Sequence, residues 1–389
     1  GREFYVIRVL RRLNQHKLGY LATHVERDAL DRSATVHAFD YENKATEALI
    51  LNSSLIYSDT SDDSGYGMHI SMNYDPNKFW NTGVYYGRFD DELNINDMGY
   101  QSRNNLSKFR TFTSYTQTDF LTTSKILERS YTFSFSKEAN THGLQLVQRT
   151  NFNFKQSFKD TSGIEIKVGL DSSGNNDLLT RGSVLAPFVK FGQEKELALT
   201  YYSRQNERWS YWGHIEKERQ SYPSFTDSVK SIGLGGNYYP SDVLKFSMSI
   251  NKTESTSWIN WLEDNKIGIY PLDRFSVRVN ASWFPKEQHE LRIKFQTTVM
   301  ETETGVEWSA DTAGNLNSTE KPVAGFDLGQ VAFQIRYKYE ISPLSHFYAV
   351  YTRGGRHYED DDVSVGKIIS ETWDNPKEDR FTLKLRIKF

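Results

Sequence analysis

The sequence predicts an all-β fold, a transmembrane antiparallel β-barrel of about 18 to 20 strands, and three observations favour it. Hydrophobic residues make up only 37% of the 389 residues, whereas aromatic residues reach 14%, and the mean hydropathy is −0.64. Apolar and polar residues alternate with period two in many segments. Short and long connectors follow one another in a regular order. This combination is expected when one side of each strand faces lipid, the other faces water, and aromatic rings gather at the membrane interfaces.

Charge and cysteine content exclude several classes of protein. The 47 Lys and Arg residues against 50 Asp and Glu residues give a formal net charge of −3, which argues against a nucleic-acid partner. The absence of Cys excludes thiolate nucleophiles, disulfides and Cys-ligated clusters. No run of about 18 apolar residues is present, so a transmembrane helix is excluded. The sequence predicts no cofactor, and any metal site would depend on His and carboxylate ligands.

The clearest alternation closes the chain, at residues 379–389. Apolar side chains occupy every second position, and mostly cationic residues occupy the positions between them. Period two places the two sets on opposite faces of a strand. The apolar set resembles the C-terminal signal by which outer-membrane barrels are delivered to the barrel assembly machinery, and it consists of Phe381, Leu383, Leu385, Ile387 and Phe389.

Similar segments recur along the whole chain, and each has the length that a tilted strand needs to cross a bilayer. We expect about nineteen strands, each of about ten residues. They are predicted at 4–12, 17–26, 33–41, 46–58, 65–75, 78–90, 105–118, 124–137, 141–155, 161–171, 184–191, 195–208, 226–239, 242–252, 273–284, 287–300, 327–340, 344–354 and 379–389.

The connectors distinguish a barrel from a soluble sandwich. Tight turns such as Tyr239–Asp242 alternate with long polar segments, and barrels have short periplasmic turns and long extracellular loops. Both ends of a sandwich face the same solvent, so nothing would sort its loops in this way. The expected extracellular loops are 91–104, 172–183, 206–225, 253–272, 301–326 and 355–378.

The odd number of predicted strands leads to an expectation about the beginning of the chain. If the last strand ends in the periplasm, counting back through the hairpins makes the strand at 4–12 run downward from an outer Gly1. Bacterial barrels of one chain have an even number of strands. We therefore expect residues 1–389 to form a single barrel domain that lacks upstream strands. An upstream segment or a second polypeptide would then lie beside the strand at 4–12.

Basic residues gather on the polar side of the C-terminal strands. On the lipid side each would cost roughly 2 to 4 kcal/mol near the membrane midplane, so they are expected to line the lumen. There they would either attract anions or form ion pairs across the lumen with acids such as Glu128, Glu165 and Asp171, and the sequence leaves both alternatives open. The predicted lumen-lining residues are Arg278, Arg292, Lys294, Arg336, Lys338, Lys384 and Arg386.

No catalytic motif emerges from the sequence, so an enzyme is not expected. The nine His residues lack HExxH spacing, and GxSxG and Walker motifs are absent. One oxygen-rich segment could bind calcium or another ligand, although Asn and Asp side chains also order turns by bonding to the backbone. Its candidate residues are Asp90, Asp91, Asn94, Asn96 and Asp97. Trp209, Trp212, Trp258 and Trp261 could stack on sugars in outer loops or lie in an interface girdle.

Two stretches carry a resemblance to a known family. The first runs from Glu3–Val9 to Leu18–Thr23, and the second is Phe89–Asn104. They resemble the barrel portion of uncharacterised bacterial outer-membrane proteins, in which a periplasmic domain similar to family-9 carbohydrate-binding modules usually precedes the barrel. The resemblance implies an outer-membrane location, contact with lipid and lipopolysaccharide, and a missing upstream domain. It implies no substrate, because the family has no established activity.

Three functions remain open from the sequence. The first is a channel or transporter for an unidentified solute, anionic or organic. The second is a barrel that anchors or helps to assemble a periplasmic or surface protein. The third is a soluble all-β carbohydrate-binding protein, which detergent dependence would separate from the first two.

Overall fold

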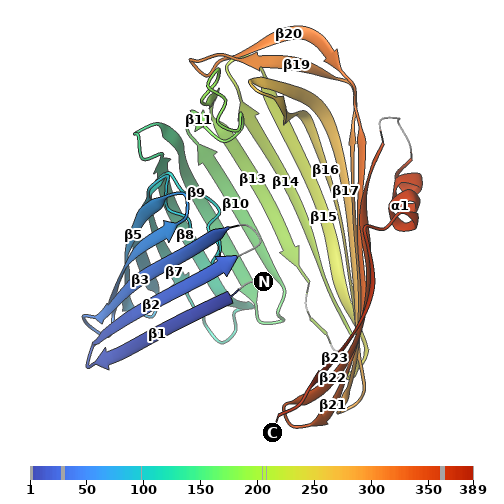
Figure 1. The fold of residues 1–389 in the computed structure, drawn as a ribbon. Coiled ribbons are helices and arrows are strands. Elements are labelled where there is room, and N and C mark those ends of the chain that lie inside the picture. Colours follow the sequence, from blue (N-terminus) through green and yellow to red (C-terminus); the bar gives the residue numbers. More distant parts are fainter. Residues whose placement is uncertain are drawn as a thin grey trace. The chain divides into compact units, whose positions relative to one another are not determined.

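A computed structural model shows a protein built almost entirely of antiparallel strands (Figure 1). It describes residues 3–27, 31–97, 99–203, 205–206, 208–359 and 364–388. Twenty-one of its strands belong to one large sheet, and the short strands β11 (Gly174–Asn176) and β12 (Val189–Phe191) lie outside that sheet. In the described part of the chain, no helix is long and apolar enough to span a bilayer.

The chain divides into two compact units, and the first comprises residues 1–122, 128–154 and 168–176. From β1 to β8, each strand pairs antiparallel with the next one in the chain. Strands β9 and β10 run from one unit into the other. The strands are β1 (Glu3–Leu13), β2 (His16–Arg27), β3 (Arg32–Lys44), β4 (Leu49–Thr60), β5 (Ser64–Asn77), β6 (Trp80–Phe89), β7 (Leu106–Gln117), β8 (Ile126–Ala139), β9 (Gln145–Phe158) and β10 (Gly163–Asp171).

The second unit comprises residues 123–127, 155–167 and 177–389. Its ladder runs from β13 to β18, continues to β21 and ends at β23. The hairpin of β19 and β20 is inserted between β18 and β21. The elements are β13 (Glu194–Tyr202), β14 (Trp209–Ser221), β15 (Thr226–Ser241), β16 (Leu244–Glu263), β17 (Lys266–Lys286), β18 (His289–Thr302), β19 (Gly305–Ala310), β20 (Leu316–Val323), β21 (Asp327–Ser342), β22 (Ser345–Glu359), α1 (Val365–Asp374) and β23 (Glu378–Arg386).

Period two divides the sheet into an apolar face and a polar face. In β23 the apolar side chains are 59 to 64% exposed, at Phe381, Leu383 and Leu385, and Ile387 just beyond the strand is 50% exposed. Such a row of large apolar groups is unfavourable in water and is what a lipid-facing strand requires. Phe389, the last residue of the predicted assembly signal, lies outside the described residues.

The number of predicted long strands agrees with the observed number, because one wrongly predicted strand is offset by one that was not predicted. In the described part of the chain, nineteen strands have nine or more residues. The segment 184–191 is not a crossing strand, because its apolar residues Ala186 and Val189 are buried in a small core with Ile267, Ala310 and Leu316. The segment 206–225, expected to be a loop, contains β14, whose charged residues obscure the alternation.

The expected loop at 253–272 is also wrong. Strands β16 and β17 continue through it as a hairpin, and they have 20 and 21 residues, about twice the length needed to cross a bilayer. Trp258 and Trp261 therefore lie on a strand, as do Trp209 and Trp212 in β14. In the second unit, long connectors do remain at 303–326 and 360–377 at one end of the ladder, whereas turns at its other end, such as 242–243 and 343–344, are short. Long connectors also remain at 90–105 and 172–188.

The two faces of β23 predict opposite responses to a charge. Leu385→Lys places an ammonium group on the apolar face, which costs roughly 2 to 4 kcal/mol near the midplane, whereas Lys384→Glu changes a residue of the polar face. We expect Leu385→Lys to lower the yield of folded protein in outer-membrane fractions more strongly. Heat-modifiable mobility on gels measures this yield. Equal folded yields for the two variants would contradict the assignment of the faces.

Candidate functional site on the polar face

The seven predicted lumen-lining residues lie on one face of the second unit. The register places Arg292 opposite Arg336, and Tyr348 lies opposite both Lys338 and Lys384. Side chains of directly opposed residues point to the same side of a sheet. The same register assigns the other members of the set, Arg278, Lys294 and Arg386, to this face.

Two of these basic residues form ion pairs. The Glu290 side chain is buried, and its Oε1 lies 2.9 Å from Nη2 of Arg336 and also contacts Nε of Arg292. The shared carboxylate offsets the repulsion between two directly opposed guanidinium groups. The Glu290–Arg336 pair joins the neighbouring strands β18 and β21, whereas Arg292 pairs with Glu290 within β18.

The other five basic residues lack such a carboxylate. In the described ranges, no Asp or Glu oxygen lies within ion-pair distance of Arg278, Lys294, Lys338, Lys384 or Arg386. Arg278 and Lys294 line a cavity of about 440 Å³, together with the amide side chains of Asn280, Gln296 and Gln334 and the charged residues Arg353 and Glu378. The cationic and amide donors of this lining outnumber its one carboxylate, Glu378, which forms an ion pair with Arg380, so the cavity is suited to binding an anion.

An acidic sector lies on the polar face of β13 and β14, which belong to the same unit. Carboxylate oxygens of Glu196, Glu216 and Glu218 lie within 4.8 Å of one another. Lys167 Nζ is 2.5 Å from Glu196 Oε1 and partly compensates this charge. The sequence does not predict this sector, because its pattern indicates a loop at 206–225. The i, i+2 spacing of Glu216 and Glu218 was the available signal, because it puts both residues on one face of a strand.

The first unit has a second cavity on its polar face. It has a volume of about 500 Å³, and Tyr85, Arg110 and Phe112 line it together with Ser71 and Asn73. Tyr85 lies opposite both Ser71 and Arg110 in the ladder, so β5, β6 and β7 each contribute to the cavity. An exposed guanidinium group beside two aromatic rings is suited to an anion with an organic part.

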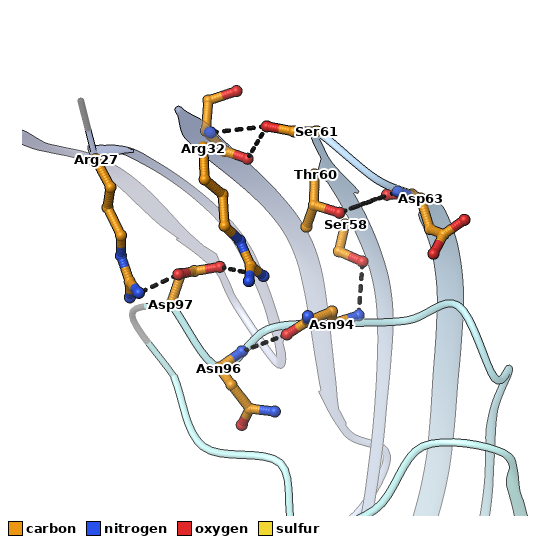
Figure 2. A network of polar contacts seen from close by, with 10 residues as sticks. Arg27, Arg32, Ser58, Thr60, Ser61, Asp63, Asn94, Asn96 and Asp97 are labelled. Atoms are coloured by element: carbon orange, nitrogen blue, oxygen red, sulfur yellow. Dashed lines mark hydrogen bonds and ion pairs between the residues drawn. The ribbon is translucent and has the colours of Figure 1, made fainter. Parts of the chain in front are cut away.

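The loop at 90–105 folds onto this polar face. Figure 2 shows Asp97 between Arg27 and Arg32, at 2.6 and 3.1 Å from their guanidinium groups. The backbone N–H of Asn94 donates to Ser58 Oγ at 2.9 Å. Leu93 is buried against Gly65, where a methyl group would collide with the loop backbone. The loop is therefore anchored at three points along β2 to β5.

The other residues of the predicted loop site shape the loop itself. Asp90 accepts hydrogen bonds from the N–H groups of Leu93, at 2.8 Å, and Tyr66, at 2.6 Å. Asn96 Oδ1 accepts from Gln101 N–H at 2.7 Å, and Asp91 lies 3.5 Å from the His142 ring. These bonds are those expected for an ordered turn. Binding of a metal or another ligand by Asp90, Asp91, Asn94, Asn96 and Asp97 stays a prediction.

Comparison with solved structures finds one alignment with a TM-score of 0.50, which agrees with this architecture, and others with lower scores. The siderophore receptor PirA from Acinetobacter baumannii aligns with a TM-score of 0.50 at 9% sequence identity, over 96% of this chain and 74% of that one. The outer membrane channel DcaP of A. baumannii gives a TM-score of 0.39 at 10% identity, over 85% of this chain and 93% of that one. OmpT, an outer membrane protein of Vibrio cholerae, gives a TM-score of 0.39 at 8% identity, over 85% of this chain and 94% of that one.

The protein is an antiparallel β-barrel of the outer-membrane class, as its sequence predicts. A barrel of this class, with an apolar face turned to lipid, lies in the outer membrane of a Gram-negative bacterium. The sequence profile of the family described as "Domain of unknown function (DUF5916)" matches residues 5–387, and the chain belongs to this family. No curated protein matches the chain.

The anchored loop gives a prediction about local stability. In Asp97→Asn the two charge-assisted contacts with Arg27 and Arg32 are weakened, and we expect amide exchange in residues 90–97 to accelerate by about tenfold, equivalent to roughly 1.4 kcal/mol. Hydrogen exchange with mass spectrometry in detergent measures this rate. Asp91→Asn is the matched control, because Asp91 is 52% exposed in its side chain. Equal exchange in both variants would show that Asp97 does not anchor the loop.

Proposed function

We propose that the protein is an outer-membrane channel or transporter that favours anionic solutes. The observation that carries the proposal is the row of five basic side chains without an ion-pair partner in the described part of the polar face: Arg278, Lys294, Lys338, Lys384 and Arg386. The proposed role is transport without chemical conversion of the solute.

Confinement makes this charge effective. A wall of one sign next to a low-dielectric membrane focuses the electric field and raises the local concentration of counter-ions. The acidic sector at Glu196, Glu216 and Glu218 lies several strands away in the same sheet, so the two signs are segregated rather than mutually neutralised. A solute that carries an anionic group would therefore follow the basic strands.

The cavity around Arg110 adds a preference for the chemical class of solute. Tyr85 and Phe112 supply aromatic surface beside the guanidinium group, which favours an organic anion over a small inorganic one. The loop at 90–105, anchored on the neighbouring strands β2 to β5, would restrict access at the extracellular rim.

The structure bears differently on the two other functions that the sequence leaves open, a soluble carbohydrate-binding protein and a barrel that anchors another protein. A soluble carbohydrate-binding protein conflicts with the apolar face, because exposed Leu383 and Leu385 need lipid. A barrel that serves as an anchor or assembly partner for another protein needs no unpaired charge inside. It remains the alternative to transport, and absence of conductance would favour it.

The proposal predicts anion selectivity that depends on particular residues. Replacing Lys338, Lys384 and Arg386 by Gln should shift the reversal potential of the channel toward that of a non-selective pore, because the field along the wall weakens. The measurement is made in a planar bilayer under a KCl gradient. The difference should shrink from 0.1 M to 1 M salt, as the Debye length falls from about 10 Å to about 3 Å.

The ion-paired arginine provides the matched control. Arg336→Gln combined with Glu290→Gln removes one positive and one negative charge, so the net charge of the wall is unchanged and the reversal potential should change much less than for Lys338→Gln alone. Cation preference in the intact protein would contradict the proposal. An equal shift for the double variant and for Lys338→Gln would show that the net positive charge of this wall does not set the selectivity.

A further inference from the structure

The only helix in the described ranges lies on the extracellular part of the second unit. Figure 1 shows α1 beside the end of the ladder, and it contacts β21 and β22. Ser364 caps its first turn by accepting from Lys367 N–H. Ile368 and Thr372 are buried against the sheet, whereas Gly366, Ser370 and Asp374 are exposed.

This helix is held at a fixed position on the sheet. A methyl group at Gly329 would collide with Thr372 and Ile368, so the helix lies directly on the backbone of β21. Arg353 of β22 donates to the Trp373 carbonyl at 2.8 Å from Nη2 and at 3.2 Å from Nε. A side chain on α1 that points toward β22 is therefore held at a fixed position relative to the side chains of that strand.

Three potential metal ligands meet where α1 crosses β22. His357 and Glu359 are two residues apart on the strand and share its outer face, and Glu371 reaches them from the helix. Nε2 of His357 lies 3.2 Å from Oε2 of Glu359 and 2.9 Å from Oε2 of Glu371. All three ligand atoms lie within 4.8 Å of one another.

These separations fit a shared ion. Neighbouring ligands around a metal with bonds of about 2.1 Å lie about 3 Å apart. Lys367 Nζ lies 3.6 Å from the other oxygen of Glu371, Oε1, so it orients the carboxylate and leaves Oε2 free for the ion. The three side chains are 24 to 30% exposed, which allows an ion to enter from solvent.

Charge also favours a divalent cation. Two carboxylates and a neutral imidazole carry two negative charges, which one divalent ion balances, whereas a protonated imidazole would balance only one. One nitrogen and two oxygen ligands suit first-row transition ions such as Zn²⁺ better than they suit Ca²⁺, which prefers six or more oxygens.

We propose that His357, Glu359 and Glu371 bind one divalent transition-metal ion, with zinc as the probe, and that the ion fastens α1 to β22. Three protein ligands leave coordination positions for water. The ion crosslinks the connection between the last two strands to the sheet, and it therefore stabilises the extracellular face of the barrel. The inference is independent of the proposed transport.

The test uses the full chain without an affinity tag, folded in detergent and treated with a chelator. Titration with ZnCl₂ in a calorimeter should show one tight site, and Glu371→Gln or His357→Gln should weaken it by at least about tenfold, since even outer-sphere partners contribute that much. His142→Gln is the matched control, because His142 is an exposed histidine 3.5 Å from the Asp91 carboxylate. It should leave the tight site unchanged.

A second measurement reports on the helix. Zinc should slow amide exchange in residues 365–374 of the wild type and of His142→Gln, but not in Glu371→Gln, while heat-modifiable mobility confirms that each variant is folded. Glu359→Gln tests the site without altering α1. The proposal is overturned if the wild type binds neither Zn²⁺ nor Mn²⁺ tightly, or if the ligand variants bind zinc as the wild type does.

Discussion

A strand that crosses a bilayer must place every backbone N–H and C=O in a hydrogen bond with a neighbouring strand, because the hydrocarbon region contains no water. This constraint explains the continuous antiparallel ladders from β1 to β8 and from β13 to β23. It also forces side chains to alternate between two faces. Because one face contacts lipid and must carry apolar side chains such as Leu385, only the other face can carry polar and charged side chains that contact a solute.

The function of the polar face then depends on how its charges are compensated. Glu290 contacts Arg292 on its own strand and Arg336 on the neighbouring strand, so its one negative charge offsets one of the two positive charges. Lys294 and Lys338 lie on the same strands without such a partner, so their field extends into the space that the face lines. One buried carboxylate therefore distinguishes the cations that have an ion-pair partner from those that have none in the described part of these strands.

Beyond the membrane the constraint on the apolar face changes. The ends of β16 and β17 extend past the length that a bilayer requires, and there protein replaces lipid as the covering. Ile267 is buried in a core with Ala310 and Leu316, and α1 covers the outer face of β21 and β22. The loop at 90–105 covers the polar face in the same manner, with Leu93 on Gly65. Extracellular segments thus cover parts of both faces of the sheet that would otherwise be exposed to water.

The sequence by itself determined the fold class, most strand positions and the shared face of the seven basic residues on the C-terminal strands, because period two is a local property that backbone geometry enforces. It could not reveal β14, where charges on both faces hide the alternation, or the burial of Ala186 in a loop core. The sequence also could not predict which charged side chains form ion pairs with one another. Only tertiary structure decided that Glu290 neutralises Arg336, that Asp97 joins Arg27 to Arg32, and that Glu371 meets His357, because these contacts join residues 14 to 70 positions apart through strand register and loop packing.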